Sequence, residues 1–249
     1  MAGEVLYTEF FGLPGSGKST ITDAVLDRLN EHAFTAYSRD MLIRDRSKKS
    51  LLARSWPLLL FILCHIPLSL KTISYCLLFK PLNLSSLKYA YACVRTASKI
   101  KEASRQAIQN GCSIVLFDQG VLQDLWSVGV TAEPLFDTKF RNTLQKLLGC
   151  FCKTHHFSVV FFEVDVERAA ERIFSRPHSI HRFDNMDRDR AHCLLKTKAK
   201  YLKVLMETTL RLNKVDTLKI ENNDSPQLPI QEIYHFMMKK HASVISTLK

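Results

Sequence analysis

Gly12-Leu13-Pro14-Gly15-Ser16-Gly17-Lys18-Ser19-Thr20 follows an apolar run, residues 5–11, and precedes a stretch of helical periodicity that begins near Ile21. The segment fits the pattern G-x-x-x-x-G-K-[ST], which connects a strand to a helix. Its glycines allow backbone conformations that residues with a Cβ avoid, so successive N–H groups can turn inward around one anion. We therefore interpret it as a phosphate-binding loop between a strand and a helix.

The polar positions of this loop have separate expected roles. Lys18 places an ammonium group between the β- and γ-phosphates of a nucleotide, and the Ser19 hydroxyl ligates the Mg²⁺ that bridges them. Ser16 and Thr20 reach the α- and β-phosphates. The residues expected to bind the nucleotide phosphates are Gly12, Pro14, Gly15, Ser16, Gly17, Lys18, Ser19 and Thr20.

Length and composition are those of one globular α/β domain. The chain has 249 residues, of which 46% are hydrophobic and 24% charged, and this excludes general disorder. The formal net charge of +11 suits three kinds of partner: a polyanionic substrate, an anionic membrane surface or nucleic acid. Composition alone does not choose among them.

Cysteine usage and the start of the chain predict a location in the cytoplasm. The seven cysteines are odd in number and scattered, which is typical of a reducing compartment. Residues 1–10 contain Glu4 and Glu9 and lack a basic leader followed by an apolar core, so no signal peptide is predicted.

Four further apolar runs predict strands, and acidic residues after two of them are candidates for the site. Arg39-Asp40 comes after the run 34–38, and Asp118 comes directly after 112–117. Ligands of open α/β sheets bind at the carboxyl ends of the strands, so these residues are candidates for the site. Asp118 is the expected partner of Mg²⁺ or its waters. The remaining predicted strands are 157–164 and 217–221.

A leucine-rich segment, 51–84, interrupts this pattern of strands and helices. Its charge-free window, 55–70, is 16 residues long and contains Pro67, so it is shorter than the ~20 residues of a membrane-spanning helix. Three interpretations stay open: a helical insertion packed on the sheet or lining an acceptor pocket, a peripheral membrane contact through 51–82 with basic flanks, and a hairpin in the bilayer.

Arginines are concentrated after the predicted strand 157–164. Arg168, Arg172 and Arg176 are spaced four apart, and Arg182 follows them. Salt bridges with neighbouring glutamates are one explanation of these arginines. The other is phosphate binding, since a guanidinium can donate two hydrogen bonds to one phosphate.

With these motifs in this order, most of the chain outside about 42–110 resembles the thymidylate kinase-like branch of the P-loop nucleotide and nucleoside kinases. In that family the second strand ends in a Thr-Arg-Glu type triplet facing the acceptor, and Ser38-Arg39-Asp40 is similar to it. The third strand there ends in Asp-Arg, where this chain has Asp118-Gln119. The family's lid has an Arg-x-x-x-Arg helix and an Arg-Phe-Glu type motif, and Arg172-x-x-x-Arg176 with Arg182-Phe183-Asp184 is similar.

The resemblance implies one three-layer P-loop NTPase domain over 1–249, with about five parallel strands in the order 2-3-1-4-5 and helices on both faces. A helical insertion would occupy about 42–110 and an arginine-rich lid, including Arg168 and Arg182, about 166–186. The lid residues Arg172, Arg176 and Arg182 would close over the donor phosphates, and the loop 222–225 after the last strand would pack near the adenine. It also implies ATP as donor, Mg²⁺, a nucleoside-like or nucleotide-like acceptor and a homodimer as in many such kinases. The expected catalytic residues are Lys18, Asp118, Asp40, Arg172 and Arg176, with Ser19 and Asp118 on the metal and Arg39 and Asp40 facing the acceptor.

Two other functions remain open from the sequence. One is a kinase acting on a glycan or lipid intermediate, because the leucine-rich segment replaces a region that usually encloses the acceptor. The other is an ATPase or nucleotide-dependent switch at the membrane surface. A nucleic-acid partner is not expected, because the basic residues concentrate at the predicted lid and beside the apolar segment.

Overall fold

The computed structural model describes most of the chain outside the leucine-rich segment. The described residues are 5–32, 36–38, 106–130, 138–152, 156–175, 186–212, 215–222 and 225–246, together with the single positions 70, 98 and 103. The predicted insertion about 42–110 and the membrane-contacting segment 51–82 therefore lie almost entirely outside the described residues. Within the described part, no helix is both long enough and apolar enough to cross a membrane.

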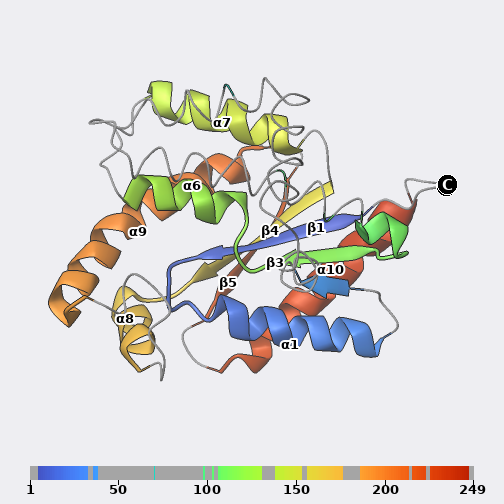
Figure 1. Ribbon diagram of the computed structural model, residues 1–249, viewed down its shortest axis with the longest axis horizontal. Helices are drawn as coiled ribbons and strands as arrows, with labels where there is room; N and C mark the ends of the chain where they lie inside the picture. Colours follow the sequence, from blue (N-terminus) through green and yellow to red (C-terminus); the bar gives the residue numbers. More distant parts are fainter. Residues whose placement is uncertain are drawn as a thin grey trace, which may run out of the picture.

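The strands form one parallel sheet in the order β2-β3-β1-β4-β5. Helices cover both of its faces, with α1 and α10 on one and α6, α7 and α9 on the other (Figure 1). An α/β fold with a parallel sheet is thus confirmed, and the strand order is the one that the resemblance implied. The strands are β1 (Leu6–Gly12), β2 (Ala36–Ser38), β3 (Ile114–Phe117), β4 (His156–Glu163) and β5 (Val215–Glu221).

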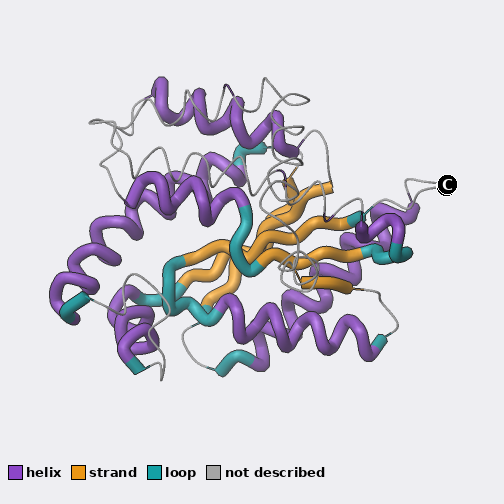
Figure 2. The backbone as a smooth tube through the Cα atoms, in the orientation of Figure 1, coloured by secondary structure: helices purple, strands orange, loops and turns teal. Residues whose placement is uncertain are grey.

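The helices follow the strands as the sequence periodicity predicts. The stretch of helical periodicity that begins near Ile21 belongs to α1 (Lys18–Glu31), whose buried side chains include Ile21, Val25 and Leu29. Figure 2 shows the sheet between its two layers of helices. The other helices are α6 (Val121–Val130), α7 (Thr138–Cys152), α8 (Val166–Phe174), α9 (Arg188–Leu210) and α10 (Gln227–Ser246).

Side chains of the central strands alternate between two hydrophobic cores, because successive residues of a strand point to opposite faces. In β4, Val159 and Phe161 belong to the core beneath α6 and α9. Val160 and Phe162 belong to the core shared with α1 and α10. Strands buried on both faces need continuous apolar sequences, which is why their positions were predictable.

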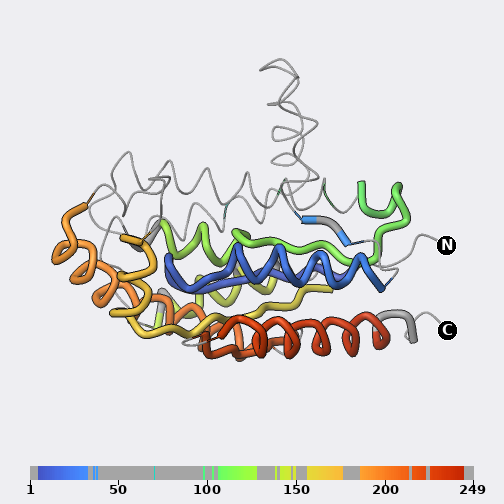
Figure 3. Tube along the Cα trace, turned by 90° about the horizontal axis from the view of Figure 1, so that it is seen from below, coloured from blue at the N-terminus to red at the C-terminus, as the bar shows by residue number. Residues whose placement is uncertain are grey.

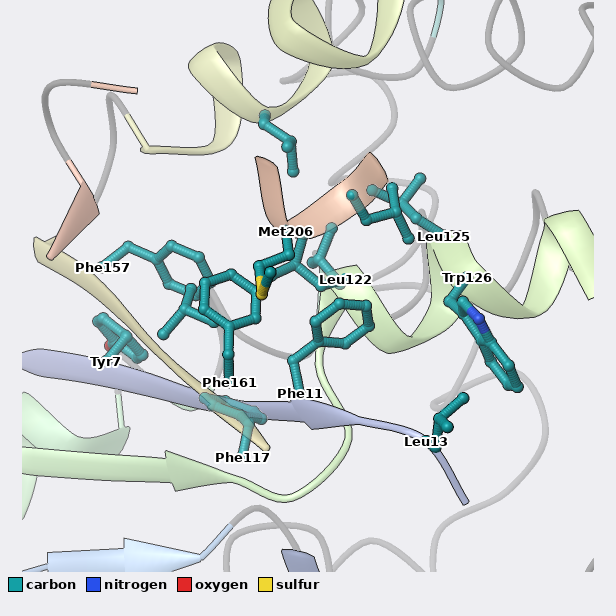
Figure 4. Close-up of a cluster of buried hydrophobic side chains, with 14 of the residues drawn as sticks. Tyr7, Phe11, Leu13, Phe117, Leu122, Leu125, Trp126, Phe157, Phe161 and Met206 are labelled. Carbon is teal, nitrogen blue, oxygen red and sulfur yellow. The ribbon is translucent and has the colours of Figure 1, made fainter. Parts of the chain in front are cut away.

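The first core joins the sheet to α6 and α9. Aromatic rings of the sheet point toward these helices, and Trp126 of α6 is 2% exposed (Figure 4). Trp126 Nε1 donates to the carbonyl of Lys198 at 3.2 Å, and the Tyr201 hydroxyl donates to the carbonyl of Leu125 at 2.9 Å. These bonds fix α6 against α9, so the start of α6 has a defined position beside the phosphate loop.

The second core holds α1 beside α10. These two helices lie along the same face of the sheet in both orthogonal views (Figure 3). The Arg28 guanidinium of α1 lies 4.8 Å from the ring centroid of Tyr234 in α10, a cation–π contact between the two helices. The helix that begins in the phosphate loop is thus fixed along its length by the C-terminal helix.

Candidate nucleotide site

The loop between β1 and α1 has the conformation that anion binding requires. Gly15 and Gly17 have φ of 82° and 84°, in the left-handed region that favours glycine. Gly17 is also the N-cap of α1, and no side chain caps this helix or adds an acidic group to its first turn. The N–H groups and the positive end of the helix dipole at this terminus are therefore available to an external anion.

Lys18 folds back over the loop. Its Nζ donates to the carbonyls of Gly12 and Leu13, both at 2.8 Å, and to the Ser16 hydroxyl at 3.3 Å. These contacts hold the ammonium group at the concave side of the loop. A positive charge is thus fixed where the loop would receive phosphate.

Ser19 and Asp118 meet across the mouth of the loop. The Ser19 Oγ donates to Asp118 Oδ2 at 3.4 Å, although the two residues are 99 positions apart in the sequence. Parallel pairing of β1 with β3 brings them together, because both residues lie beyond the carboxyl ends of neighbouring strands. Among the described residues, no group of three or more His, Cys, Asp or Glu side chains is arranged to hold a metal ion.

A cavity of about 240 Å³ opens beside the loop. One wall is the loop itself, from Pro14 to Thr20, and the other is formed by Asp118, Gln119 and the first turns of α6. Gln123 contributes a buried side-chain oxygen, Oε1, that accepts no hydrogen bond within the described structure. The cavity therefore joins the candidate phosphate site to a wall of mostly polar side chains.

Glu9 fixes the start of α6 from inside the core. Its side chain is fully buried, and its two carboxyl oxygens accept hydrogen bonds from the backbone N–H groups of Leu122 at 3.2 Å and Gln123 at 3.0 Å. A Cβ at Gly120 would lie only 2.4 Å from this carboxyl group, so the turn after Asp118 packs directly on it. Burial raises the pKa of Glu9 to about 8, with a smaller contribution from the charge of Asp124; the backbone hydrogen bonds oppose this.

Asn222 and Arg172 contact the loop side of the site from β5 and α8. Asn222 directly follows β5, and its Nδ2 donates to the Ser16 carbonyl at 2.7 Å. Arg172 Nη1 donates to the backbone carbonyl of Asn222 at 2.8 Å. The carboxyl end of β5 is thereby connected to the phosphate loop.

The structure brings together part of the predicted site. Lys18, Ser19 and Asp118 surround the mouth of the loop, and Pro14 and Thr20 line the same cavity. Arg172 lies on α8, partly buried, and Arg168 is exposed on that helix. Because α8 ends at Phe174, the third of the arginines spaced four apart comes after the end of this helix in the sequence. Four predicted residues lie outside the described residues: Arg39, Asp40, Arg176 and Arg182.

The contacts of Glu9 and Asn222 in the site were not predicted from the sequence. The sequence signal for Glu9 is a single carboxylate within an apolar run, and such a group must find hydrogen-bond donors when it is buried. Asn222 was expected only as part of a loop, 222–225, that packs near the adenine. Its contact with Ser16 had no sequence signal.

Comparison with known proteins gives similarity at the level of fold only. No family model matches the chain. No curated protein matches it either. Among solved structures, the chain is similar to deoxyadenosine kinase from M. mycoides with the products dCMP and a flexible dCDP bound. The TM-score is 0.48 and the sequence identity 14%, and the alignment covers 96% of this chain and 100% of that one. It is also similar to shikimate kinase from Acinetobacter baumannii in complex with shikimate, with a TM-score of 0.44 and 14% identity, covering 95% of this chain and 94% of that one. Similarity at this level carries no argument about the activity of this chain.

Proposed function

We propose that this chain is an ATP- and Mg²⁺-dependent phosphotransferase that acts on a small acceptor. The observation that carries the proposal is the approach of Ser19 to Asp118, at 3.4 Å, across the mouth of a loop that holds Lys18 on its concave side. Phosphoryl transfer requires positioning and positive charge more than covalent chemistry. A phosphate loop, a fixed ammonium group and an adjacent carboxylate supply those requirements.

The loop supports binding of the donor phosphates. Its left-handed glycines and the uncapped start of α1 direct backbone N–H groups toward one place. Compared with its hydrogen bonds to the Gly12 and Leu13 carbonyls, the Lys18 bond to Ser16 Oγ is longer, at 3.3 Å, and is the one that a phosphate oxygen would more readily replace. Lys18 would then stabilise negative charge that develops on the transferred group.

The Ser19 and Asp118 pair fits Mg²⁺. One hydroxyl and one carboxylate oxygen form a set of oxygen ligands, which Mg²⁺ prefers, and Mg²⁺ usually takes its remaining ligands from phosphates and water. Ser19 and Asp118 would hold the ion, and the ion would neutralise charge on the β- and γ-phosphates. Two protein ligands suffice for such a site, which agrees with the absence of a larger acidic or histidine cluster among the described residues.

The acceptor would bind in the cavity between the loop and α6. Gln123 and Asp124 line this cavity, so its α6 wall carries polar and acidic side chains. Such a wall suits an acceptor that carries hydroxyl or amino groups, including the nucleoside-like acceptors of the thymidylate kinase-like branch. From the resemblance, Asp40 would accept the proton of the attacking hydroxyl and Arg39 would contact the acceptor; both assignments remain predictions.

Lys18→Ala tests the proposal directly. Without the ammonium group, acceptor-dependent release of ADP should fall by at least about 100-fold, since one fixed charge at the transferred group is removed. The assay would measure ADP release from ATP and Mg²⁺ with a panel of nucleosides, nucleoside monophosphates and polyols. Lys200→Ala, at an exposed position on α9, is the matched control and should retain activity.

Two results would contradict the proposal. Retained transfer in a folded Lys18→Ala variant would show that the loop is not the site of the donor phosphates. ADP release at one rate with and without every acceptor would instead indicate an ATPase or a nucleotide-dependent switch. Circular dichroism of both variants would show that the fold is intact.

A further inference from the structure

Asn222 has an unusual set of contacts for a residue that ends an edge strand. It is only 4% exposed. Its backbone N–H donates to the carbonyl of Glu163 at 2.9 Å, which continues the pairing of β5 with β4 by one residue. The side chain then turns to the phosphate loop, where Nδ2 donates to the Ser16 carbonyl at 2.7 Å in a buried contact.

The same side chain packs against Gly17. A Cβ at Gly17 would lie 2.5 Å from Asn222 Nδ2, which is closer than side chains approach one another. The amide of Asn222 therefore touches Gly17 and bonds to Ser16, the two residues immediately before Lys18. Their backbone conformation determines where the loop directs its N–H groups.

The orientation of the Asn222 amide follows from this bond. Asn222 Oδ1 is buried and accepts no hydrogen bond from the described residues. A buried amide that satisfies only its nitrogen is positioned by the acceptor it faces, which is the Ser16 carbonyl. If an oxygen replaced the Asn222 Nδ2, two hydrogen-bond acceptors, this oxygen and the Ser16 carbonyl, would face each other without a donor.

Arg172 holds Asn222 from the opposite side. Its Nη1 donates to the Asn222 backbone carbonyl at 2.8 Å, so α8 fixes the residue whose side chain supports the loop. A hydrogen bond from a charged donor is among the stronger ones in proteins. In this structure the guanidinium of Arg172 is thus linked to the loop through one residue.

We propose that Asn222 positions the phosphate loop, and that Arg172 acts on the loop through Asn222. The inference rests on the proposed function only in taking the loop, Gly12 to Thr20, as a phosphate site. It differs from the two expectations drawn from the resemblance, in which 222–225 packs near adenine and Arg172 closes directly over the donor phosphates. Both residues are positioning residues in this account.

Binding of inorganic tripolyphosphate with Mg²⁺ to the full chain separates loop positioning from adenine contact. Asn222→Leu, which keeps the approximate shape and removes the donor without adding a charge, and Asn222→Ala should each weaken tripolyphosphate binding at least about tenfold, the effect of losing one buried hydrogen bond. ATP binding should weaken by the same factor. Unchanged tripolyphosphate affinity beside weaker ATP binding would show that Asn222 contacts the base, and would overturn the proposal.

A double-mutant cycle tests the link from Arg172. Arg172→Ala should weaken tripolyphosphate binding in the wild-type background and add little in the Asn222→Ala background, because the side chain through which it acts is gone. Two effects that add fully would mean that Arg172 contacts the phosphates by itself. Lys219→Ala is the control: Lys219 lies on β5, the strand that Asn222 follows, and its exposed ion pair is with Glu163 of β4, so the variant should leave binding unchanged.

If neither Asn222 variant folds, hydrogen exchange of the phosphate-free Arg172→Ala variant tests the proposal instead. Arg172→Ala should speed exchange of the backbone amides of Ser16, Gly17 and Lys18, because the loop loses its support. Unchanged exchange would overturn the proposal, since a residue that meets only phosphate has no effect when phosphate is absent. Failure of the proposed function would look different: no transfer to any acceptor, while tripolyphosphate binding and its dependence on Asn222 persist.

Discussion

Glu9 is the residue whose chemistry depends most on its environment. It is a carboxyl group inside β1, on the face that also carries Tyr7 and Phe11 into the first core. Burial disfavours its charged form, and with a pKa of about 8 it is largely protonated at neutral pH. Its hydrogen bonds to Leu122 and Gln123 place the start of α6, and with it the turn that carries Asp118.

Glu9→Gln should change how stability depends on pH. The pKa of Glu9 is raised from 4.5 to about 8 on folding, so the stabilisation from its protonated form is complete below about pH 4.5 and is lost as the pH rises through 8. Wild type should therefore lose on the order of a few kcal/mol between pH 5 and pH 8.5 from this group alone. Glutamine does not ionise and should avoid that loss.

Urea unfolding of both proteins at pH 5.5, 7 and 8.5 would measure the difference. The Glu9→Gln variant should gain on the wild type steadily across this range. A constant difference in the free energy of unfolding would mean that Glu9 binds the same number of protons in the folded and the unfolded chain over this range. Asp124 is the acidic neighbour that raises the pKa of Glu9, so Asp124→Asn should shift the wild-type transition toward lower pH.

The site residues that could be predicted are those that belong to a local sequence pattern. The positions of Lys18 and Ser19 follow from the loop pattern, and that of Asp118 from the end of a buried apolar run. Glu9 and Asn222 find their partners 113 and 206 positions away, and no local pattern encodes those pairs. They depend on the completed order of the sheet.

At the scale of elements, α8 and the phosphate loop are in direct contact. A Cβ at Gly15 would lie 2.2 Å from the backbone carbonyl oxygen of Ala169, in the middle of α8. Gly15 is thus needed twice: for its φ of 82° and for the approach of a helix. The loop is supported by α8 at Gly15 and by Asn222 at Gly17.

Gly15→Ala compared with Gly111→Ala isolates that contact. Both glycines have positive φ, 82° and 64°, so each substitution should cost about 1 kcal/mol from the backbone conformation alone. Gly111 has open space at its Cβ position, whereas Gly15 meets Ala169. Gly15→Ala should therefore lower the free energy of unfolding clearly further than Gly111→Ala, as measured in urea. Equal losses would mean that α8 does not press on the loop.

Elements buried on both faces were predicted closely, and connecting or exposed ones less so. The strand expected at 157–164 is His156–Glu163. The strand expected at 217–221 begins earlier, at Val215, because β5 pairs with β4 from Phe157 onward although most of its residues are not buried. The strand is longer than predicted because it pairs with β4, and hydrophobic periodicity does not reveal such pairing.

At the scale of the whole molecule, the sheet order explains why distant residues meet at one edge. β1 lies between β3 and β4, so the loop after β1 has Asp118 beyond one neighbour and the start of α8 beyond the other. β5 adds Asn222 on the far side of β4. The loop is thus connected to four strands and to both helical layers, and a ligand that orders it should stabilise the domain as a unit.

Ligand binding should therefore appear as global stability. At a free concentration of tripolyphosphate with Mg²⁺ of 100 times its Kd, the free energy of unfolding should rise by about 2.7 kcal/mol, the value for one site present only in the native state. Urea unfolding followed by tryptophan fluorescence would report this rise, because Trp126, one of the two tryptophans of the chain, is buried in the first core and bonds from α6 to α9. The Lys18→Ala variant should show a much smaller rise at the same ligand concentration. An equal rise in that variant would show that the anion binds elsewhere on this basic chain. If tripolyphosphate slowed hydrogen exchange only near the loop and left the free energy of unfolding unchanged, the loop would not be coupled to the rest of the sheet.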